Sequence, residues 1–383
     1  MFDFLIEGFK GLDIYMVAMW AIGALLIYLA IKKDMEPALL LPMGFGAILV
    51  NLPNSPVIKE IVYEGIGKIE SSGGIIQSLF QVGIDASEAM PLLLFIGIGA
   101  MIDFGPLLTN PKLFILGGAA QFGIFVTVLL AAIIGFPLPD AASIGIIGAA
   151  DGPTAIHVAK SLNSEYLSAI VVVAYSYMAL VPIVQPVVIK MCTTKKERLI
   201  RMKYASGEIS QTSRILFPIV VTVISGLIAP ESVSLVGMLM FGNLIRECGV
   251  LKSLSETAQT VFPNIITLLL GITIAFQMTA DKFLRVETVI IMLLGLFAFV
   301  FDTIGGVMCA KLMNLFSKDK INPMVGAAGI SAFPMAARVV QKMGLKEDST
   351  NHLLMHAIGA NVSGQIASAV VGGLIIGLVT KLM

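Results

Sequence analysis

The chain contains little charge and few cysteines or histidines. Only 13% of its 383 residues are charged, and 25 basic residues balance 25 acidic ones. Because the net charge is zero, nothing in the composition indicates a nucleic-acid partner. The three cysteines, Cys192, Cys248 and Cys309, are odd in number and widely spaced. This pattern argues against a disulfide framework and against a cysteine-based metal site.

A cleavable signal peptide is also not expected. Residues 1–10 carry two acidic side chains and lack the basic region with which such signals begin. Apolar residues, in contrast, make up 57% of the chain, and the mean hydropathy is +0.93. These values are typical of an all-α, polytopic membrane protein that lies in a lipid bilayer.

About ten segments are long and apolar enough to cross a bilayer, which takes roughly 20 residues. They begin near residues 14, 37, 90, 112, 166, 214, 232, 261, 287 and 353. Two further segments, near 140–161 and 322–343, contain Gly and Pro and either cross as broken helices or re-enter. The basic segment 190–213 is expected to be cytoplasmic, and the re-entrant alternative keeps most other basic connections on that side. We therefore favour re-entrant segments.

Three short motifs of the first half recur in the second half. Residues 45–49 resemble 241–245, residues 93–98 resemble 267–272, and residues 148–160 resemble 326–338. The motifs keep the same order, at separations of 196, 174 and 178 residues, and such collinearity indicates an internal repeat. Small-residue runs that recur by chance are the alternative.

We accordingly expect three parts: a first repeat over 1–189, a basic cytoplasmic linker over 190–213, and a second repeat over 214–383. Each half then holds five crossings and one broken segment. Because five is odd, the second half enters the membrane from the opposite side, which makes the repeat inverted. In ion transporters built this way, the two broken segments meet near the membrane midplane and the ion binds between them.

Asp151 is the most informative single residue. It follows an uncharged run, within Gly148-Ala149-Ala150-Asp151-Gly152-Pro153-Thr154. An ionised carboxylate at membrane depth costs about 2.5–3.5 kcal/mol, so it is seldom present without a function. Gly and Pro directly after it weaken the helix and free backbone carbonyls, which a bound cation can satisfy. The pattern predicts an ion site at Asp151.

Neutral oxygen donors accompany the second broken segment and the last helix. They are Asn322, Ser331, Asn361, Ser363 and Gln365, with a helix break at Gly326 and Gly329, and with Tyr175 and Tyr177 in an apolar helix between the halves. Amide, hydroxyl and carboxylate oxygens suit an alkali cation. A single Asn or Ser more often ties two membrane helices together, so the prediction depends on the group and on Asp151.

Asp302 is a second carboxylate within an apolar run. It is a candidate second ion ligand, a proton relay, or an acid kept protonated by burial. His352 and His356 are four residues apart and could share a helix face, but no third ligand accompanies them. A zinc site is therefore not expected.

Three motifs resemble the β subunit of sodium-translocating, biotin-dependent decarboxylases. The motifs are residues 148–156, 320–339 and 359–362, and the resemblance extends over essentially the whole chain. Members serve oxaloacetate, methylmalonyl-CoA, glutaconyl-CoA and malonate decarboxylases. The resemblance implies a membrane-bound enzyme subunit, a translocase that decarboxylates carboxybiotin and couples this reaction to Na+ export with proton uptake.

The resemblance also implies roles for individual residues. Positions matching the sodium or proton site are Asp151, Asn322, Ser331 and Asn361, with Tyr177 nearby. Asp302, Gly326 and Ser363, which were singled out above from the sequence itself, are secondary candidates. Asp151 and Arg338 would be catalytic, and Arg338 would bind carboxybiotin where it arrives from the cytoplasm. The chain contains no Met-Lys-Met biotinylation motif, so a partner must deliver the biotin.

The partners implied by the resemblance are a biotin carrier, a carboxyltransferase and a small membrane-anchor subunit. It further implies a trimer of this chain, an elevator-like movement, and a bacterial or archaeal cytoplasmic membrane (the cell inner membrane). The acid consumed upstream is selected by the carboxyltransferase and is not identified by this chain. The alternative is a stand-alone secondary transporter, either a sodium–carboxylate symporter or a Na+/H+ antiporter, which would share the repeat, the broken helices and the acid.

Overall fold

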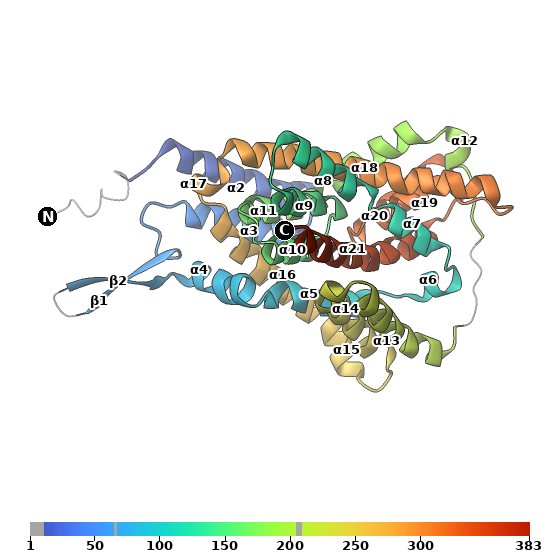
Figure 1. Ribbon diagram of the computed structural model, residues 1–383, viewed down its shortest axis with the longest axis horizontal. Helices are drawn as coiled ribbons and strands as arrows, with labels where there is room; N and C mark the ends of the chain where they lie inside the picture. The colour runs from blue at the N-terminus through green and yellow to red at the C-terminus, as the bar shows by residue number, and fades with distance from the viewer. Residues whose placement is uncertain (1–10, 65–66, 204–208) are drawn as a thin grey trace. The chain divides into compact units, whose positions relative to one another are not determined.

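The computed structural model describes residues 11–64, 67–203 and 209–383. Within these ranges the chain is helical apart from one antiparallel pair of strands (Figure 1). Residues 1–10, in which no signal region is expected, and residues 204–208 of the basic linker lie outside the described residues. The chain divides into two compact units, and each unit combines two separate stretches of the sequence.

The smaller unit comprises Met1–Leu94 and Phe262–Ile290. Its elements are α2 (Ile14–Lys33), α3 (Pro37–Val50), β1 (Lys59–Glu64), β2 (Gly67–Gly73), α4 (Ile75–Phe80), η1 (Gln81–Ala86), the start of α5 (Ala89–Met101), most of α16 (Val261–Ile274), η4 (Ala275–Gln277), α17 (Ala280–Phe283) and the start of α18 (Val286–Phe316). Asn51 connects its two stretches, because the side-chain amide donates to the Met278 carbonyl at 2.8 Å and its oxygen accepts from the Ala280 N–H at 2.8 Å.

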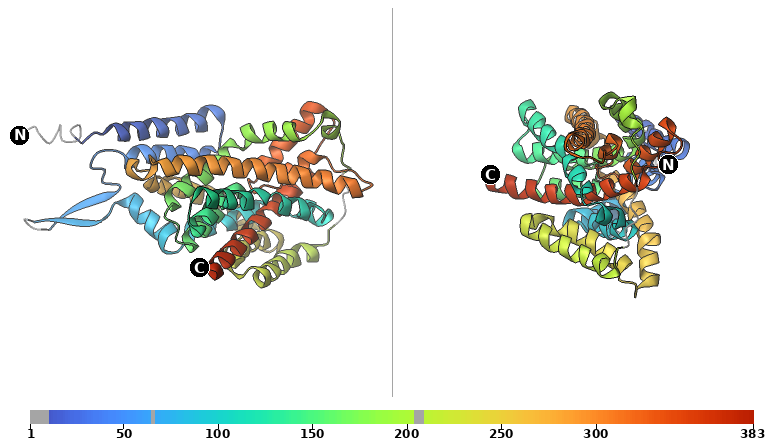
Figure 2. Two further views of the ribbon diagram at one scale, coloured as in Figure 1. Left: turned by 45° about the horizontal axis from the view of Figure 1, so that its top comes forward. Right: turned by 90° about the vertical axis from the view of Figure 1, so that its right-hand side faces the viewer.

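The larger unit comprises Phe95–Val261 and Ile291–Met383 and contains most of the candidate residues. Besides the remaining parts of α5 and α18, its elements are α6 (Gly105–Thr109), α7 (Leu113–Ala119), α8 (Phe122–Ile134), α9 (Leu138–Gly145), η2 (Ile146–Ala149), α10 (Gly152–Ser161), α11 (Leu167–Cys192), α12 (Lys195–Arg198), α13 (Gln211–Ile228), η3 (Pro230–Ser232), α14 (Val233–Glu247), α15 (Lys252–Gln259), α19 (Pro323–Ala327), α20 (Met335–Glu347) and α21 (Leu354–Leu382). The two longest helices, α18 and α21, are the orange and dark red helices of Figure 2.

Six helical segments of the described chain are long and apolar enough to cross a membrane. They are Ile14–Lys33, Leu113–Ile134, Gln211–Ile228, Lys252–Gln277, Val286–Phe316 and Leu354–Leu382; two bent pairs, Ile75–Ala86 with Ala89–Met101 and Leu167–Met178 with Leu180–Cys192, raise the number to eight. The expected number of ten is not confirmed. The segments beginning near 37 and 232 form helices of 14 and 15 residues, which are shorter than the roughly 20 needed.

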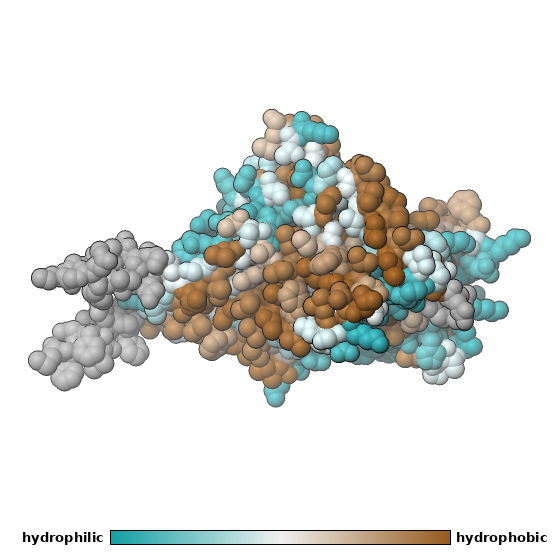
Figure 3. Space-filling view, turned by 90° about the horizontal axis from the view of Figure 1, so that it is seen from below, coloured by the Kyte–Doolittle hydropathy of each residue, from teal (hydrophilic) through white to brown (hydrophobic). Residues whose placement is uncertain are grey.

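Apolar side chains cover much of the surface shown in Figure 3. Helix α13 illustrates the pattern, because its large apolar side chains are exposed along its whole length. They are Leu216, Ile219, Val220, Val223, Ile224, Leu227 and Ile228. Exposed apolar surface of this extent is unfavourable in water and is expected where a helix faces lipid.

Both broken segments form helical hairpins that return to where they began. The first hairpin consists of α9, η2 and α10. Its two ends meet at Asp140, which accepts from the Ser164 hydroxyl at 2.6 Å and from the Glu165 N–H at 3.0 Å. Its tip is the turn at Ala150, whose φ of 52° lies in the left-handed region. The interruption predicted near 140–161 is therefore present.

The second hairpin consists of α19, an irregular tip over 328–334, and α20. Its two ends also meet, because the side-chain amides of Asn322 and Asn351 both donate to the carbonyls of Arg198 and Ile200. Arg198 additionally forms an ion pair with Glu347 at 2.8 Å. The basic linker thus binds the base of the second hairpin, and both hairpins agree with the re-entrant alternative.

Helix α21 shows how the two hairpins are arranged. Leu353, just before its first residue, donates to the Gln341 side chain near the base of the second hairpin, and Asn361 reaches the tip of that hairpin. Further along, Ser368 contacts Asp151 at the tip of the first hairpin, and Gly372 lies beside Thr154 in α10. The two hairpins therefore approach each other from opposite ends of a helix about 44 Å long.

Candidate functional site

The tips of the two hairpins touch through their backbones. The N–H of Ser331 in the second tip donates to the carbonyl of Ala149 in the first tip, at 3.1 Å. Glycine makes the close contact with α21 possible: a Cβ on Gly364 would collide with the carbonyl of Gly329. A residue with a side chain at Gly364 would separate α21 from the second tip.

Asp151 is buried beside this contact, with 3% of its surface exposed. It has an extended backbone and directly precedes α10, where Pro153 stands in the first turn, a position that suits proline. Its Oδ2 accepts from the Thr154 hydroxyl at 2.6 Å and from the Ser368 hydroxyl at 3.2 Å. No Lys or Arg of the described ranges forms an ion pair with it. A buried carboxylate with hydroxyl donors and no cationic side chain is suited to a cation from outside the protein.

Tyr175, and not Tyr177, lies next to this carboxylate. The ring of Tyr175 packs so closely against Gly152 that a Cβ there would collide with it, and its buried hydroxyl has no partner within the described chain. Tyr177 donates its hydroxyl to the carbonyl of Met292 in α18. The hydroxyl of Tyr177, the predicted tyrosine ligand, is therefore used in a contact between α11 and α18.

Side-chain amides hold the carbonyls at the tip of the second hairpin. Gln121 donates to the carbonyl of Gly329 at 3.3 Å, and Asn361 donates to that of Ile330 at 2.6 Å. Gln365 donates to the carbonyl of Ser331. Three successive carbonyls thus accept from three different side chains, which fixes the irregular backbone in place.

The oxygen atoms of the same amides have no donor. Gln121, Asn361 and Gln365 each carry a buried side-chain oxygen that is unpartnered within the described residues. A buried polar atom without a partner costs about 1–3 kcal/mol, and native proteins contain few of them. Three at one tip, near a carboxylate, are a set of hard oxygen donors of the kind that an alkali cation prefers.

Two predicted site residues lie away from the tips. Asn322 is at the base of the second hairpin, where its amide donates to two linker carbonyls at 2.8 Å each and its oxygen accepts from the Met324 N–H at 3.1 Å. Arg338 lies in the first turn of α20 and is exposed. The structure thus brings Asp151, Ser331 and Asn361 together, but not Asn322, Tyr177 or Arg338.

The secondary candidates have packing roles in the structure. A Cβ on Gly326 would collide with the carbonyl of Gly306, so this glycine lets α19 approach α18. Ser363 donates to the carbonyls of Leu113 and Ala360 and thereby ties α21 to α7.

Asp302 of α18 is fully buried beside the start of α8. Its Oδ1 accepts from the Gly123 N–H at 2.5 Å, and Gly148 of the first hairpin leaves room for its Oδ2. Oδ2 has no partner in the parts of the chain that are described.

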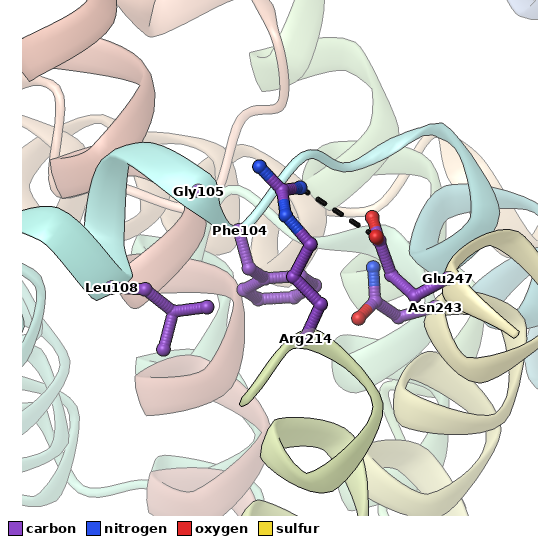
Figure 4. A pocket seen from close by; sticks show the side chains of 6 residues that line it. All are labelled: Phe104, Gly105, Leu108, Arg214, Asn243 and Glu247. Carbon is purple, nitrogen blue, oxygen red and sulfur yellow. Dashed lines mark ion pairs between the residues drawn. The ribbon is translucent and has the colours of Figure 1, made fainter. Parts of the chain in front are cut away.

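A further polar cluster lines a small recess elsewhere in the larger unit (Figure 4). Arg214 of α13 pairs there with Glu247 of α14 at 3.5 Å and with Asp103 at 3.3 Å. Asn243 donates to the carbonyl of Ile102 at 3.1 Å. These contacts join α13, α14 and the segment between α5 and α6, and they include none of the predicted site residues.

Several site residues were not selected from the sequence. Ser368 stands seven residues after Asn361, and this spacing places both on one face of α21. Thr154 follows Asp151 by three residues, within the first turn of α10. For Gln121, an amide in an otherwise apolar stretch is the signal that could have been used.

Comparison with known proteins identifies relatives over nearly the full length. A family model described as the Na+-transporting oxaloacetate decarboxylase beta subunit matches residues 15–379. The methylmalonyl-CoA decarboxylase subunit beta of Propionigenium modestum is 48% identical over 384 residues, which cover 97% of this chain and 96% of the relative.

Two further relatives agree with this match. The oxaloacetate decarboxylase beta chain of Klebsiella pneumoniae is 44% identical over 418 residues, covering 96% of each chain. The methylmalonyl-CoA decarboxylase subunit beta of Veillonella parvula is 46% identical over 375 residues, covering 98% of this chain and 96% of the relative. The similarity therefore extends over both units.

Proposed function

Because the chain belongs to the family of Na+-transporting oxaloacetate decarboxylase beta subunits, we propose that it is the membrane subunit of a decarboxylase sodium pump. In this proposal it decarboxylates carboxybiotin supplied by a carrier, and it couples the reaction to Na+ export with proton uptake. The observation that carries the proposal is the buried Asp151 carboxylate at the contact between two helical hairpins.

Sodium binds at Asp151, with Ser331 and Asn361 of the second tip contributing neutral oxygens. The unpartnered amide oxygen of Asn361 and the position of Ser331 against Ala149 support this set. The structure also supports a monovalent ion. No group of three or more His, Cys, Asp or Glu side chains suited to a metal occurs in the described part of the chain, and the set proposed here contains one carboxylate, which balances the charge of one monovalent ion.

Asp151 exchanges Na+ for H+. Burial favours the neutral acid, whereas a bound cation favours the carboxylate, so the two ions compete for the same oxygens. Each net elementary charge moved outward against 100 mV requires about 2.3 kcal/mol, which the decarboxylation must supply.

Arg338 orients the carboxylate of carboxybiotin. Its exposed guanidinium, one turn after the second tip, can form paired hydrogen bonds with a carboxylate. Cleavage of the bond between the biotin ring nitrogen and the carboxyl carbon releases CO2, and the ring nitrogen takes up a proton. A pocket that excludes water around the ring would favour this step. Asn322 and Tyr177 act on the same site indirectly. Asn322 holds the base of the second hairpin, and Tyr177 holds α11 against α18.

We also propose the inverted repeat with about ten crossings. Two equivalent glycine contacts support it: Gly46 packs against Ile272 and Ala275 in the smaller unit, and Gly242 packs against Ile96 in the larger unit. Each contact joins the first repeated motif of one half (45–49 or 241–245) to the second repeated motif of the other half (267–272 or 93–98). This correspondence supports the proposed division into repeats over 1–189 and 214–383 with a linker over 190–213.

The assembly completes the proposal. A biotin carrier, a carboxyltransferase and a small membrane-anchor subunit act with this chain, which forms a trimer in a bacterial or archaeal cytoplasmic membrane. Beta-chain names in the relatives support the presence of other subunits.

Transport in proteoliposomes tests the function. The chain is reconstituted with its carrier, and radioactive Na+ uptake is followed together with the appearance of free biotin. Wild type should move Na+ only when carboxybiotin is supplied, and Asp151→Asn, which removes the charge but keeps the size, should do neither. Sodium movement without carboxybiotin would favour a stand-alone symporter or antiporter instead.

A further inference from the structure

Gln365 is a buried amide that the sodium set above does not include. It lies in the middle of α21 with 2% of its surface exposed. Its Nε2 donates to the carbonyl of Ser331 in the second tip. A carbonyl can only accept a hydrogen bond, so the amide must face it with its nitrogen, and Oε1 must point elsewhere.

The direction of Oε1 matters because this atom is buried and, within the described ranges, has no donor. An amide oxygen in this situation lacks the hydrogen bonds that it would have in water. A cation could satisfy it, because amide oxygens are hard ligands. Oε1 is therefore a neutral oxygen available at the tip contact.

Gln365 lies on α21 between Asn361, a proposed sodium ligand, and Ser368, which contacts the proposed ligand Asp151. Asn361, Gln365 and Ser368 have i, i+4 and i+7 spacing and share one helix face. Asn361 reaches Ile330 of the second tip, and Ser368 donates to Asp151 of the first tip. Gln365 stands about 6 Å along the axis from Asn361 and about 4.5 Å from Ser368.

We infer that Gln365 is an additional sodium-binding residue, whose side-chain oxygen bridges the interval between Asp151 and Asn361. The inference rests on the proposed function. It adds a neutral ligand, so one carboxylate still balances one Na+ and the occupied site has no net charge. The hydrogen bond to Ser331 positions the amide for this role.

Sodium binding to the purified full-length chain in detergent tests the inference. The midpoint of thermal unfolding is measured against NaCl concentration, with choline chloride holding the ionic strength constant; a ligand that binds only the folded chain raises this midpoint, and the concentration dependence gives its affinity. Gln365→Leu removes the oxygen and should weaken the apparent Na+ affinity by about tenfold or more, the effect typical of losing a contact at a metal site. Gln365→Glu also loses the hydrogen bond to Ser331 but keeps an oxygen at this place, so at pH 8 it should bind Na+ at least about threefold more tightly than Gln365→Leu.

Gln185→Leu is the matched control. Gln185 of α11 is also a fully buried amide, and it donates to the carbonyl of Ala327, at the end of α19 and outside the tip, at 2.7 Å. If Gln365 only braced the hairpin, Gln365→Glu would place a carboxylate against the Ser331 carbonyl and would weaken Na+ binding as much as Gln365→Leu. That result, or equal losses in the two leucine variants, or an unchanged affinity in Gln365→Leu, would overturn the inference. If Gln365→Leu fails to fold, Gln365→Met, which also lacks the oxygen and is closer in shape to glutamine, takes its place in this comparison.

Asp151→Asn separates this inference from the proposed function. If NaCl does not raise the unfolding midpoint of wild type, or if it still raises that of Asp151→Asn, the sodium site itself is rejected, and the inference about Gln365 is rejected with it. If Asp151→Asn abolishes the rise while Gln365→Leu retains wild-type affinity, the proposed site stands and only the role of Gln365 is rejected.

Discussion

Replacement of Asp302 by alanine should destabilise the larger unit by about 2–4 kcal/mol. The carboxylate of Asp302, on α18, accepts the Gly123 N–H in the first turn of α8. It thus serves as an N-terminal cap supplied by another helix. The fully buried site offers no water to replace it, so the freed N–H costs about 1–3 kcal/mol. The cavity left by the truncated side chain adds about 1 kcal/mol.

The assay is thermal unfolding in detergent, followed by circular dichroism. In a unit of this size each kcal/mol lowers the midpoint by roughly 2–3 °C, so Asp302→Ala should lose about 5–10 °C. Asp302→Asn is the matched variant, because its amide oxygen can still accept from Gly123, and it should lose no more than about 2–3 °C. Its sodium-dependent turnover should remain within about threefold of wild type.

Two results would refute this reasoning. If Asp302→Asn is as unstable as Asp302→Ala, the hydrogen bond to Gly123 is not what the carboxylate provides. If Asp302→Asn is stable but inactive, the charge of Asp302 serves as a second ion ligand or a proton relay, the alternatives that its sequence context left open.

Three further predictions concern the contacts around the hairpins. Gly364→Val should insert a side chain against the Gly329 carbonyl, cost about 1–3 kcal/mol, and abolish sodium-dependent decarboxylation in chains that still insert into the membrane. Asn322→Ala should remove two hydrogen bonds to the linker and lower the stability of the hairpin base by about 1–3 kcal/mol, which should appear as faster hydrogen exchange at the start of α19. Unchanged exchange would show that these hydrogen bonds do not hold the hairpin to the linker. For Asp348, hydrogen bonds from the Thr350 backbone and hydroxyl, and then the Arg201 guanidinium, lower the pKa to about 2. Because the pKa of Asp348 is depressed in the folded chain, its stabilisation is complete above the usual carboxyl pKa and is lost only as the pH falls through about 2. Hydrogen-exchange protection of the linker beside Arg201 should therefore be constant from pH 8 to pH 5, and it should be lower throughout this range in Asp348→Asn. A loss of protection in wild type by pH 5 would argue against this role of Asp348.

The position of Asp151 and the two interruptions could be predicted from the sequence because their causes are local. Gly and Pro weaken a helix wherever they stand, and a carboxylate in an apolar run is costly whatever surrounds it. The hairpins lie close to the expected segments 140–161 and 322–343 for this reason.

The partners of each side chain could not be predicted, because they depend on helix rotation and on distant parts of the chain. Tyr175 and Tyr177 are two residues apart, which turns them about 200° from each other on a helix, and no sequence signal decides which one faces Asp151. The partners of Asn322 are carbonyls 122 and 124 residues away. The expected ten crossings are not confirmed for a similar reason, since an apolar stretch such as α3 has the right composition but ends after 14 residues.

The most direct test of the account is the proton balance of sodium binding. Addition of NaCl to the purified chain in weakly buffered solution, followed with a pH indicator, should release protons with a sodium dependence that matches the thermal unfolding data, and Asp151→Asn should release none. Equal proton release from the variant, or sodium binding to wild type without any release across the pH range of activity, would contradict the exchange of Na+ for H+ at this carboxylate.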